Sequence, residues 1–490
     1  MKTAVRSGCF LILLTVLLTG APVWAESMSL KDCVKEALKQ NEQLKAANYE
    51  VEARLGQRNS IRGHFLPVIG LEANAVFWDK EQVFDMSSFE SMFGGLNGIL
   101  GGFMGVFDLL NPKLGLLLNK EDQAKLADLM KGINESAASL NQPQDPMKLR
   151  NKITYGFTTT IGQPLTGLYK IYAGYKANDE LVEAAKLDRV TVAHKLEQDV
   201  STAYIGLISA VHFRETAKAG MTQIEAIEKQ VQAYLDAQMV EKNAMFKVQL
   251  QKAEIQKGLL QAENGVKLAT AALNMYMNRP LDTPIEPDMN IEVRKMDTAA
   301  MDKLQNDAVS ERPEMVSARH QVEAARMGKH AAIGAMLPDI NLFFKYENSQ
   351  GTGALTPEHQ YYGGFALSWN VWEWGASYYL VKEAEARYAQ ASATISNAQD
   401  MIKLDVKSKG LALEEAQREV AVAKAAQEQA EENLRVEKAR YEVQETTTTD
   451  LLAAQTQKLK AENDLIVARM KERSAQISLL LGVGQDLAKD

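Results

Sequence analysis

An internal repeat constrains the fold of this chain more than any other feature of its sequence. Residues 30–71 match residues 301–342 at a constant spacing of 271 positions and without a gap. A second block, Gly156-Phe157 and Gly364-Phe365, repeats at a spacing of 208, so the first copy holds an insertion of 63 residues. Two copies of one unit in one chain predict a pseudo-symmetric architecture.

The first 25 residues have the pattern of a secretory signal. Lys2 and Arg6 precede an apolar run from Phe10 to Leu18, and the small residue Ala25 ends a stretch that suits cleavage. The apolar run is shorter than the roughly 20 residues that a membrane-spanning helix needs. We expect cleavage after Ala25 and export by a bacterium, with an uncleaved anchor as the alternative.

Charge and reactive residues argue against several classes of function. The net charge of −8 gives no support to nucleic-acid binding, which usually needs a basic face. Cys33 is the one cysteine after the signal, so the mature chain cannot form an internal disulfide. The six histidines lack a metal-ligand spacing such as HExxH. We therefore expect no catalytic, cofactor or metal site and no enzymatic activity.

Four stretches of about ten residues alternate between apolar and more polar residues, as β-strands do. The strands are expected at about residues 65–78, 152–165, 339–348 and 361–373. Aromatic residues crowd their ends, which is typical of an outer-membrane barrel, with a soluble sandwich as the alternative. Four strands cannot close a spanning barrel, because such barrels need at least about eight. A trimer that supplies twelve strands is the simplest closed solution.

Long helical stretches without proline follow each expected strand pair, at residues 168–277 and 376–481. A single helix of 110 residues would run about 165 Å, so each stretch is expected to fold back near its middle. We expect the breaks near 236–243 and 444–450, the second within a run of threonines, which are poor helix formers. The Ala-rich faces suit coiled-coil packing, and a free-standing dimeric coiled coil is the alternative. A shorter helix is expected at 29–63.

The repeat and these elements predict the following organisation. A signal peptide at 1–25 precedes a first repeat at 26–279, a proline-rich linker at 280–299 and a second repeat at 300–490. The insertion spans about 81–151.

The insertion carries phenylalanines and methionines among glycines, followed by a helix-like stretch at Glu121–Lys131. We expect it on the extracellular side as a self-packed loop domain. The alternatives are a constriction over the pore of the expected barrel and a patch that contacts the outer leaflet of the membrane. The second is considered because large exposed apolar patches usually have a partner. Methionine thioethers suit Cu(I), but methionine is spread along the whole chain, which favours gap filling.

Several motifs, taken in their order along the chain, resemble those of the TolC-like outer-membrane efflux proteins. The resemblance covers essentially the whole mature chain. The supporting residues are the helix-Leu-Pro-strand junctions at Pro67 and Pro338, Arg312-Pro313-Glu314, Gly364 to Gly375, Tyr441 through Gln455, and Leu479 to Gly482.

The resemblance implies a mainly α channel-tunnel with transmembrane β-structure. Two repeats would supply long coiled-coil hairpins and four strands per protomer to a shared twelve-stranded barrel of a homotrimer. The barrel would contact outer-membrane lipid, and the helical tunnel would cross the periplasm. Its tapered tip would meet a periplasmic adaptor (membrane fusion protein) and, through it, an inner-membrane transporter. The implied function is the passive exit duct of a tripartite efflux pump or a type I secretion system.

The alternative from another class is a periplasmic coiled-coil structural or adaptor protein. Adaptors usually have one helical hairpin flanked by β-rich modules. Two hairpins and barrel-type strands in this chain favour the channel.

Asp450 is the leading candidate for a pore residue. It lies nine residues after Tyr441, where the family places an aspartate that faces the pore at the closed tip. Three carboxylates around a threefold axis would repel one another, attract cations and raise their pKa. Such a ring would restrict passage by charge. The alternative is helix capping, because an aspartate after a threonine run suits the first turn of a returning helix.

Other tip residues depart from the family pattern. Thr446 replaces a basic residue that often ties the tip shut, and Asn243 is the first-copy counterpart of Asp450, counted from Tyr234. Ala237 and Gln444 replace glycines against which adaptors commonly dock. The expected aperture residues are Asp450, Asn243 and Thr446, and the expected adaptor-docking residues are Tyr234, Ala237, Tyr441 and Gln444.

Overall fold

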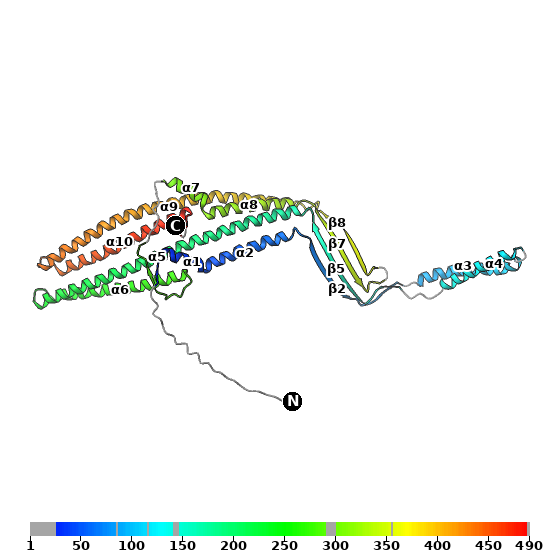
Figure 1. Cartoon of the computed structure of the whole chain (residues 1–490), viewed down its shortest axis with the longest axis horizontal. Coiled ribbons are helices and arrows are strands. Elements are labelled where there is room, and N and C mark those ends of the chain that lie inside the picture. The colour runs from blue at the N-terminus through cyan, green and yellow to red at the C-terminus, as the bar shows by residue number, and fades with distance from the viewer. Residues whose placement is uncertain are drawn as a thin grey trace, which may run out of the picture. The chain divides into compact units, whose positions relative to one another are not determined.

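The computed structural model describes residues 26–84, 87–114, 117–140, 147–290, 300–353 and 356–487. The expected signal peptide at 1–25 lies outside these residues, as does the 291–299 part of the expected linker. The chain divides into two compact units (Figure 1). The helical unit comprises the described residues up to Ser60, from Ala173 to Ala332, and from Tyr378 onward. The sheet unit comprises those of Ile61–Tyr172 and Ile333–Ser377.

The sheet unit contains four antiparallel strands in the order β2-β5-β7-β8, so β2 and β8 form the two edges. The bounds are β2 Val68–Phe77, β5 Ile153–Pro164, β7 Asp339–Gln350 and β8 His359–Ser368. Each expected strand overlaps one of these, and each repeat contributes two of them. The pseudo-symmetry of the sequence therefore appears in the sheet itself.

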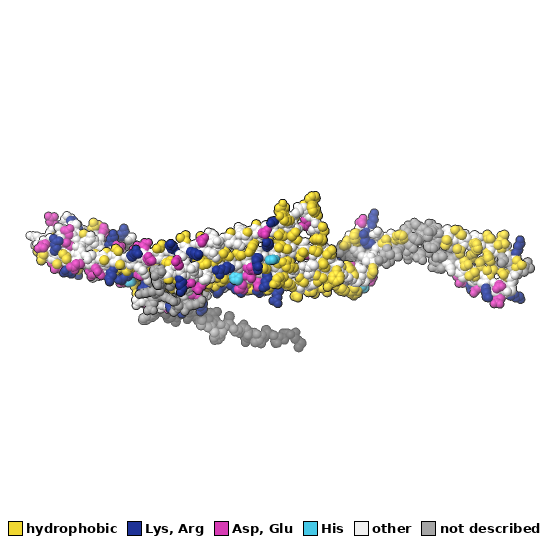
Figure 2. Space-filling model, turned by 90° about the horizontal axis from the view of Figure 1, so that it is seen from above, with side chains coloured by type: hydrophobic (Ala, Val, Ile, Leu, Met, Phe, Trp, Pro, Cys, Tyr) yellow, Lys and Arg dark blue, Asp and Glu magenta, His cyan; other side chains and the backbone are white. Residues whose placement is uncertain are grey.

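The strand register places the alternating apolar residues on one face of this sheet. Ile69 lies opposite Ile161, which in turn lies opposite Phe344. On the next pair, Leu342 lies opposite Phe365. Side chains on this face are exposed, and Figure 2 shows hydrophobic side chains gathered over the part of the chain that holds the sheet. The sheet unit thus presents a broad apolar surface without a cover from the described residues of that unit.

The insertion forms a ribbon and two helices. The helix expected at Glu121–Lys131 is confirmed, but the glycine-rich stretch before it is a helix as well rather than a loop. The elements of the insertion are β3 Gln82–Phe84, α3 Ser87–Leu114, α4 Lys120–Leu140 and β4 Met147–Arg150. The ribbon pairs β3 with β4. Beside it, the guanidinium of Arg150 stacks 3.6 Å from the centre of the Trp78 ring, whose Nε1 donates to Thr154 Oγ1 at 3.1 Å. The glycines hid α3 from the sequence, because each costs about 1 kcal/mol in a helix relative to alanine.

The helical unit is built from matched elements of the two repeats. Helices α7 and α8 begin and end 271 residues after α1 and α2, and α9 begins 208 residues after α5. The bounds are α1 Leu30–Gln40, α2 Glu42–Gly63, α5 Leu168–Asp236, α6 Lys242–Tyr276, α7 Met301–Glu311, α8 Pro313–Gly334, α9 Ala376–Glu442 and α10 Thr448–Val483. A short parallel pair, β1 Glu26–Met28 and β6 Ile285–Pro287, completes it. Among the described residues, no helix is both long and apolar enough to cross a membrane.

The single helix expected at 29–63 is interrupted at Asn41, and this expectation was wrong. The Asn41 side chain donates to the Tyr276 carbonyl at 2.9 Å and accepts from Gln43 N at 2.8 Å. In the second repeat, Arg312 ends α7 at the matching position. Both breaks therefore sit where a polar side chain binds a group far away in the sequence.

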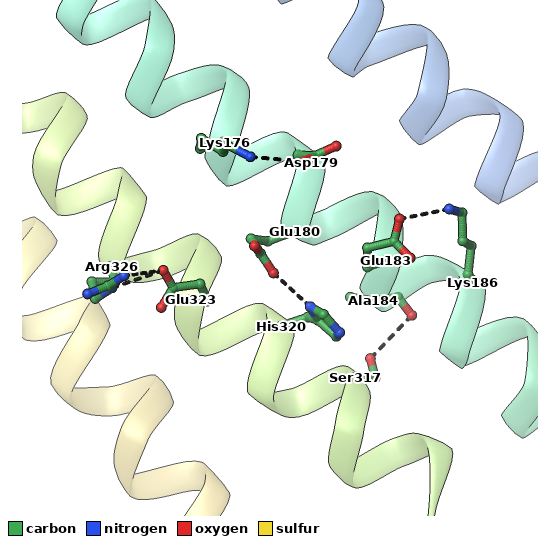
Figure 3. A network of polar contacts seen from close by, with 10 residues as sticks. All are labelled: Lys176, Asp179, Glu180, Glu183, Ala184, Lys186, Ser317, His320, Glu323 and Arg326. Atoms are coloured by element: carbon green, nitrogen blue, oxygen red, sulfur yellow. Dashed lines mark hydrogen bonds and ion pairs between the residues drawn. The ribbon is translucent and has the colours of Figure 1, made fainter.

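Polar contacts also join the long helices away from these breaks. Figure 3 shows His320 of α8 facing Glu180 of α5, with Nδ1 and Oε2 2.7 Å apart. One turn earlier, the buried hydroxyl of Ser317 donates to Asp188 Oδ1 at 2.6 Å. These contacts fix α8 against α5 at a defined register, because each needs both helices in place.

Candidate functional site

The candidate site lies at the two hairpin turns of the helical unit. Helix α5 turns into α6 over residues 237–241, and α9 turns into α10 over 443–447. Both turns hold a glutamine in the left-handed conformation, Gln238 at φ 60° and Gln444 at φ 62°. These turns fall close to the expected breaks, and they are built alike.

The two turns correspond at a spacing of 206 residues. Met239 N donates to Tyr234 O at 2.8 Å, and Glu445 N donates to Arg440 O at 2.9 Å. Helices α6 and α10 begin at Lys242 and Thr448, which have the same spacing.

This correspondence corrects one expectation from the sequence. The structural counterpart of Asp450 is Ala244 rather than Asn243. The residue that matches Gln444 is Gln238, next to the expected docking residue Ala237. The error arose because the tyrosines are not equivalent. Tyr234 lies two residues before the end of α5, whereas Tyr441 lies one residue before the end of α9.

Asp450 closes the first turn of α10. Thr447 caps the helix, and its Oγ1 accepts from Asp450 N at 3.3 Å. The Asp450 carboxylate accepts in return from Thr447 Oγ1 at 2.6 Å and from Thr447 N at 3.2 Å. Together these bonds form a capping box, with Asp450 at its third helical position.

The charge of Asp450 follows from these hydrogen bonds. Thr447, first through its hydroxyl and then through its backbone, holds the pKa of the Asp450 carboxyl below its usual value. Thr446 Oγ1 also donates to the carboxylate, at 3.3 Å. Asp450 is exposed, so a single protomer presents a solvated negative charge there at neutral pH. The ring of three carboxylates, with its raised pKa, stays a prediction for an assembly of three copies.

A groove of about 430 Å³ opens between the two turns. Five of the seven expected site residues line it, namely Tyr234, Asn243, Tyr441, Gln444 and Thr446. Ala237 and Asp450 do not line it, and both are exposed. The structure thus brings the expected docking and aperture residues to one end of the helical unit. Five of them line the groove, and the other two lie exposed outside it.

Two polar contacts that the sequence did not predict hold the turns together. Lys247 Nζ donates to Thr449 Oγ1 at 2.7 Å, which joins α6 to α10. The buried hydroxyls of Tyr441 and Thr448 lie 3.0 Å apart. Beneath them lies a hydrophobic cluster drawn from both hairpins, which includes Ile224, Val231, Met245, Val248, Leu451 and Leu452. Nothing in the sequence singles out Lys247, because it is one of many lysines in the long helices.

Two histidines elsewhere have hydrogen-bonding partners. His194 pairs with Asp486, and the ring of His359 lies within hydrogen-bond distance of Tyr346, 3.0 Å from its hydroxyl. Within the part of the chain that the structure describes, no three His, Cys, Asp or Glu side chains are grouped to hold a metal ion.

Comparison with known proteins agrees with this architecture. Residues 304–485 match the family model of the outer membrane efflux proteins. No curated protein sequence matches the chain significantly.

Solved structures share the fold at low sequence identity. The outer membrane protein VceC from Vibrio cholerae is 16% identical, with a TM-score of 0.70 over 93% of this chain and 96% of that one. The MtrE outer membrane channel of Neisseria gonorrhoeae is 17% identical, with a TM-score of 0.69 over 94% and 90%. The CmeC outer membrane channel of Campylobacter jejuni is 14% identical, with a TM-score of 0.71 over 93% and 85%.

These likenesses cover both units, since each spans more than nine-tenths of the chain. The family model matches residues 304–485, within the second repeat, and the fold over both units is that of the TolC-like channel-tunnels.

Proposed function

We propose that this protein is the passive exit duct of a tripartite efflux pump or a type I secretion system. The observation that carries the proposal is the exposed apolar face of the β2-β5-β7-β8 sheet, in a chain with the fold of outer-membrane channels. A sheet face of this kind is stable in lipid, where apolar side chains meet hydrocarbon. The protein acts in the outer membrane, its helices form a tunnel in the periplasm, and it performs no chemistry on its cargo.

The assembly is a homotrimer with a shared twelve-stranded barrel. Within the described chain, β2 and β8 each pair along one side, so their outer edges offer unpaired backbone groups. Unpaired backbone groups are costly in a bilayer, because no water is present to bond them. Pairing β2 of one copy with β8 of the next satisfies both edges, and three copies close a barrel of twelve strands.

The helical tip meets a periplasmic adaptor, which links the duct to an inner-membrane transporter. The groove between the turns offers aromatic and polar side chains, Tyr234, Tyr441 and Gln444 among them, at the free ends of the hairpins. The lining is mainly polar, with Glu241, Asn243 and Lys247 beside the tyrosines, so the groove suits a partner segment that offers hydrogen-bonding groups.

Asp450 forms an acidic ring at the periplasmic aperture of the trimer. Its carboxylate is exposed and ionised at neutral pH in one protomer. Three such charges at close range attract cations and oppose the passage of anions.

The mass of the detergent-extracted particle tests the proposal. Outer and inner membranes are separated, and the particle is sized after extraction. We expect a mass of three chains, each 54.2 kDa before loss of its leader, in the outer-membrane fraction and nowhere else. The purified particle should also conduct ions across a planar bilayer. A monomer or dimer released with the periplasm would contradict the channel and favour the coiled-coil structural or adaptor protein.

A further inference from the structure

Helix α3 of the insertion carries an exposed apolar seam with the spacing of a coiled coil. Its residues are separated by three, four, three and four positions: Leu96, Ile99, Phe103, Val106 and Leu110. All five are exposed, Ile99 by 71% and Phe103 by 73%. Apolar residues at this spacing mark the contact line between supercoiled helices. We call these five residues the α3 seam.

The seam lies on a different face of α3 from the one that packs within the insertion. Leu100, Met104 and Phe107 are partly buried, and they recur at spacings of four and three along a separate line of the helix. Helix α4 has matching partly buried residues at Leu126 and Met130. Figure 1 shows the two helices folded back along each other. The packing of α3 on α4 therefore does not use the seam, which faces solvent in a single copy. Figure 2 shows hydrophobic side chains on the surface of this hairpin.

Glycines border the seam and permit a close approach. Gly95, Gly98, Gly102 and Gly105 each precede a seam residue, and a side chain added at any of them would meet nothing within 4 Å. Small residues beside a helix contact let two backbones come near each other.

Residues 91–107 contain no Asp, Glu, Lys or Arg. A contact between identical helices puts identical residues opposite each other, so a seam of this kind avoids repulsion between like charges.

We propose that α3 binds α3 of the other copies of this chain through the seam, as a parallel coiled coil. The inference rests on the proposed homotrimer, whose threefold axis makes the helices parallel and sets equal residues at equal height. The chain itself links the two contacts. It leaves the edge strand β2, which borders the neighbouring copy in the proposed barrel, and continues through β3 into α3.

The size of the seam favours copies that are already held together. Five apolar side chains cover on the order of 300–600 Å² in one copy, within the range of the largest functional patches on single proteins. Stable specific interfaces bury about 800 Å² per partner. The seam therefore adds to an existing assembly and does not create one by itself.

The charge distribution argues against a lipid surface as the partner. Helices that lie on membranes usually carry many Lys and Arg residues on the polar face. Outside its seam and its buried line, α3 has mostly small, polar and further apolar residues such as the exposed Leu109, and Lys113 is its one basic residue. On α4 the basic residues alternate with acidic ones, as in the Lys125 and Glu121 pair.

Disulfide cross-linking in the intact trimer tests the proposal. Ile99→Cys places a thiol in the seam, and Gly101→Cys places one on the opposite side of the same helix, in open space. The native Cys33 is fully buried and will not compete. After mild oxidation, we expect a cross-linked dimer on a denaturing gel for Ile99→Cys and at least tenfold less for Gly101→Cys. Val106→Cys, two turns along the seam, should behave as Ile99→Cys does.

The mass of the particle, measured on the same samples, separates this inference from the proposed function. Trimers without a cross-link at either seam position, or with equal cross-linking at Gly101, would overturn the seam while leaving the duct intact. Quenching of a fluorophore on Ile99→Cys by brominated lipid would also overturn it, in favour of a lipid contact. If the unmodified protein formed no trimer, the proposed function itself would be contradicted.

Discussion

The rings of Tyr234 and Tyr441 pack against each other at the tip of the helical unit, with centroids 5.8 Å apart and an angle of 40° between their planes. Tyr234 comes from α5 in the first repeat and Tyr441 from α9 in the second. Their contact lies in the wall of the tip groove and joins the two hairpins within one protomer. Only 3% of the Tyr441 surface is exposed, and Tyr441 belongs to the hydrophobic cluster beneath the turns. Tyr441 therefore contributes more to the packing of the tip than the partly buried Tyr234 does.

Removal of one hydroxyl tests how the second turn is held. Tyr441→Phe leaves the buried Thr448 hydroxyl without its partner at 3.0 Å. We expect a loss of about 0.5–1.5 kcal/mol in the free energy of unfolding, the usual worth of such a bond. Thermal unfolding of the purified protein, followed by its helical circular dichroism, measures this.

Tyr234→Phe is the matched control for this measurement. The Tyr234 hydroxyl accepts from Gln230 Nε2 at 3.3 Å and is less buried, so its loss should cost less than about 0.5 kcal/mol. Equal losses in the two variants would mean that the buried pair has no special part in the turn.

Replacement of Asp450 by asparagine separates its charge from its capping role. Asp450→Asn keeps an oxygen that can accept from Thr447 but removes three charges from the proposed ring. We expect weaker block of single-channel current by divalent cations, because acidic rings concentrate cations. Recordings over a series of Mg²⁺ concentrations measure the shift.

Thr447→Val supplies the opposite change. It removes the capping hydroxyl and leaves the Asp450 charge in place. The helix should lose about 1 kcal/mol of stability, as other capping substitutions do, while divalent block stays as in the unmodified protein. If Asp450→Asn left the block unchanged, the acidic ring would be wrong.

Two neighbouring positions of β2 test which face of the sheet meets lipid. Leu71 lies on the apolar face and is 69% exposed, and Glu72 points to the other face. Leu71→Arg should cost roughly 2–4 kcal/mol if the residue lies near the middle of the bilayer, and much less near its edge. Glu72→Arg should be tolerated. The amount of trimer in the outer-membrane fraction compares them, and equal recovery would contradict a lipid-facing apolar surface.

Local patterns in the sequence predicted the sheet and the hairpins because their causes are local. Alternation fixes which residues share a face, and the register places Ile69, Ile161, Phe344 and Phe365 together as expected. The second hairpin turn was expected from a run of poor helix formers, and that threonine run supplies Thr447 as the cap of α10.

Features that depend on distant partners were missed. The helix break at Asn41 depends on the carbonyl of Tyr276, which lies 235 residues away. The pairing of Asp450 with Asn243 failed because one extra residue between Tyr234 and the end of α5 leaves no mark in the sequence. Helix α3 was missed because its glycines lower the helix propensity of the segment. The spacing of the α3 seam can be recognised only after the segment is known to be helical.

Arg312 joins three helices through one buried and one partly buried polar contact. Its guanidinium donates from Nε to the Gly482 carbonyl and from Nη2 to the Asp405 carboxylate. Lys409 Nζ donates to the same carboxylate at 2.8 Å. Burial alone would raise the pKa of Asp405, but the hydrogen bonds from Lys409 and Arg312 outweigh it and hold the pKa below its usual value.

Acid should therefore weaken the helical unit through Asp405. A carboxyl with a lowered pKa contributes stability that is present above its unfolded pKa, about 3.8, and is lost as the pH falls through the folded pKa. We expect Arg312→Gln to cost about 1–2 kcal/mol at neutral pH, because a buried hydrogen bond to Gly482 and a partly exposed ion pair with Asp405 are lost. The variant should also lose less further stability than the unmodified protein between pH 5 and pH 3.

Arg326→Gln is the control, because Arg326 pairs with Glu323 on the exposed surface of α8. Exposed pairs contribute little, so its unfolding free energy should stay within about 0.5 kcal/mol of the unmodified protein. Chemical unfolding in detergent across the pH range compares the three proteins. If Arg312→Gln kept the full acid sensitivity of the unmodified protein, that sensitivity would have to arise from carboxylates other than Asp405.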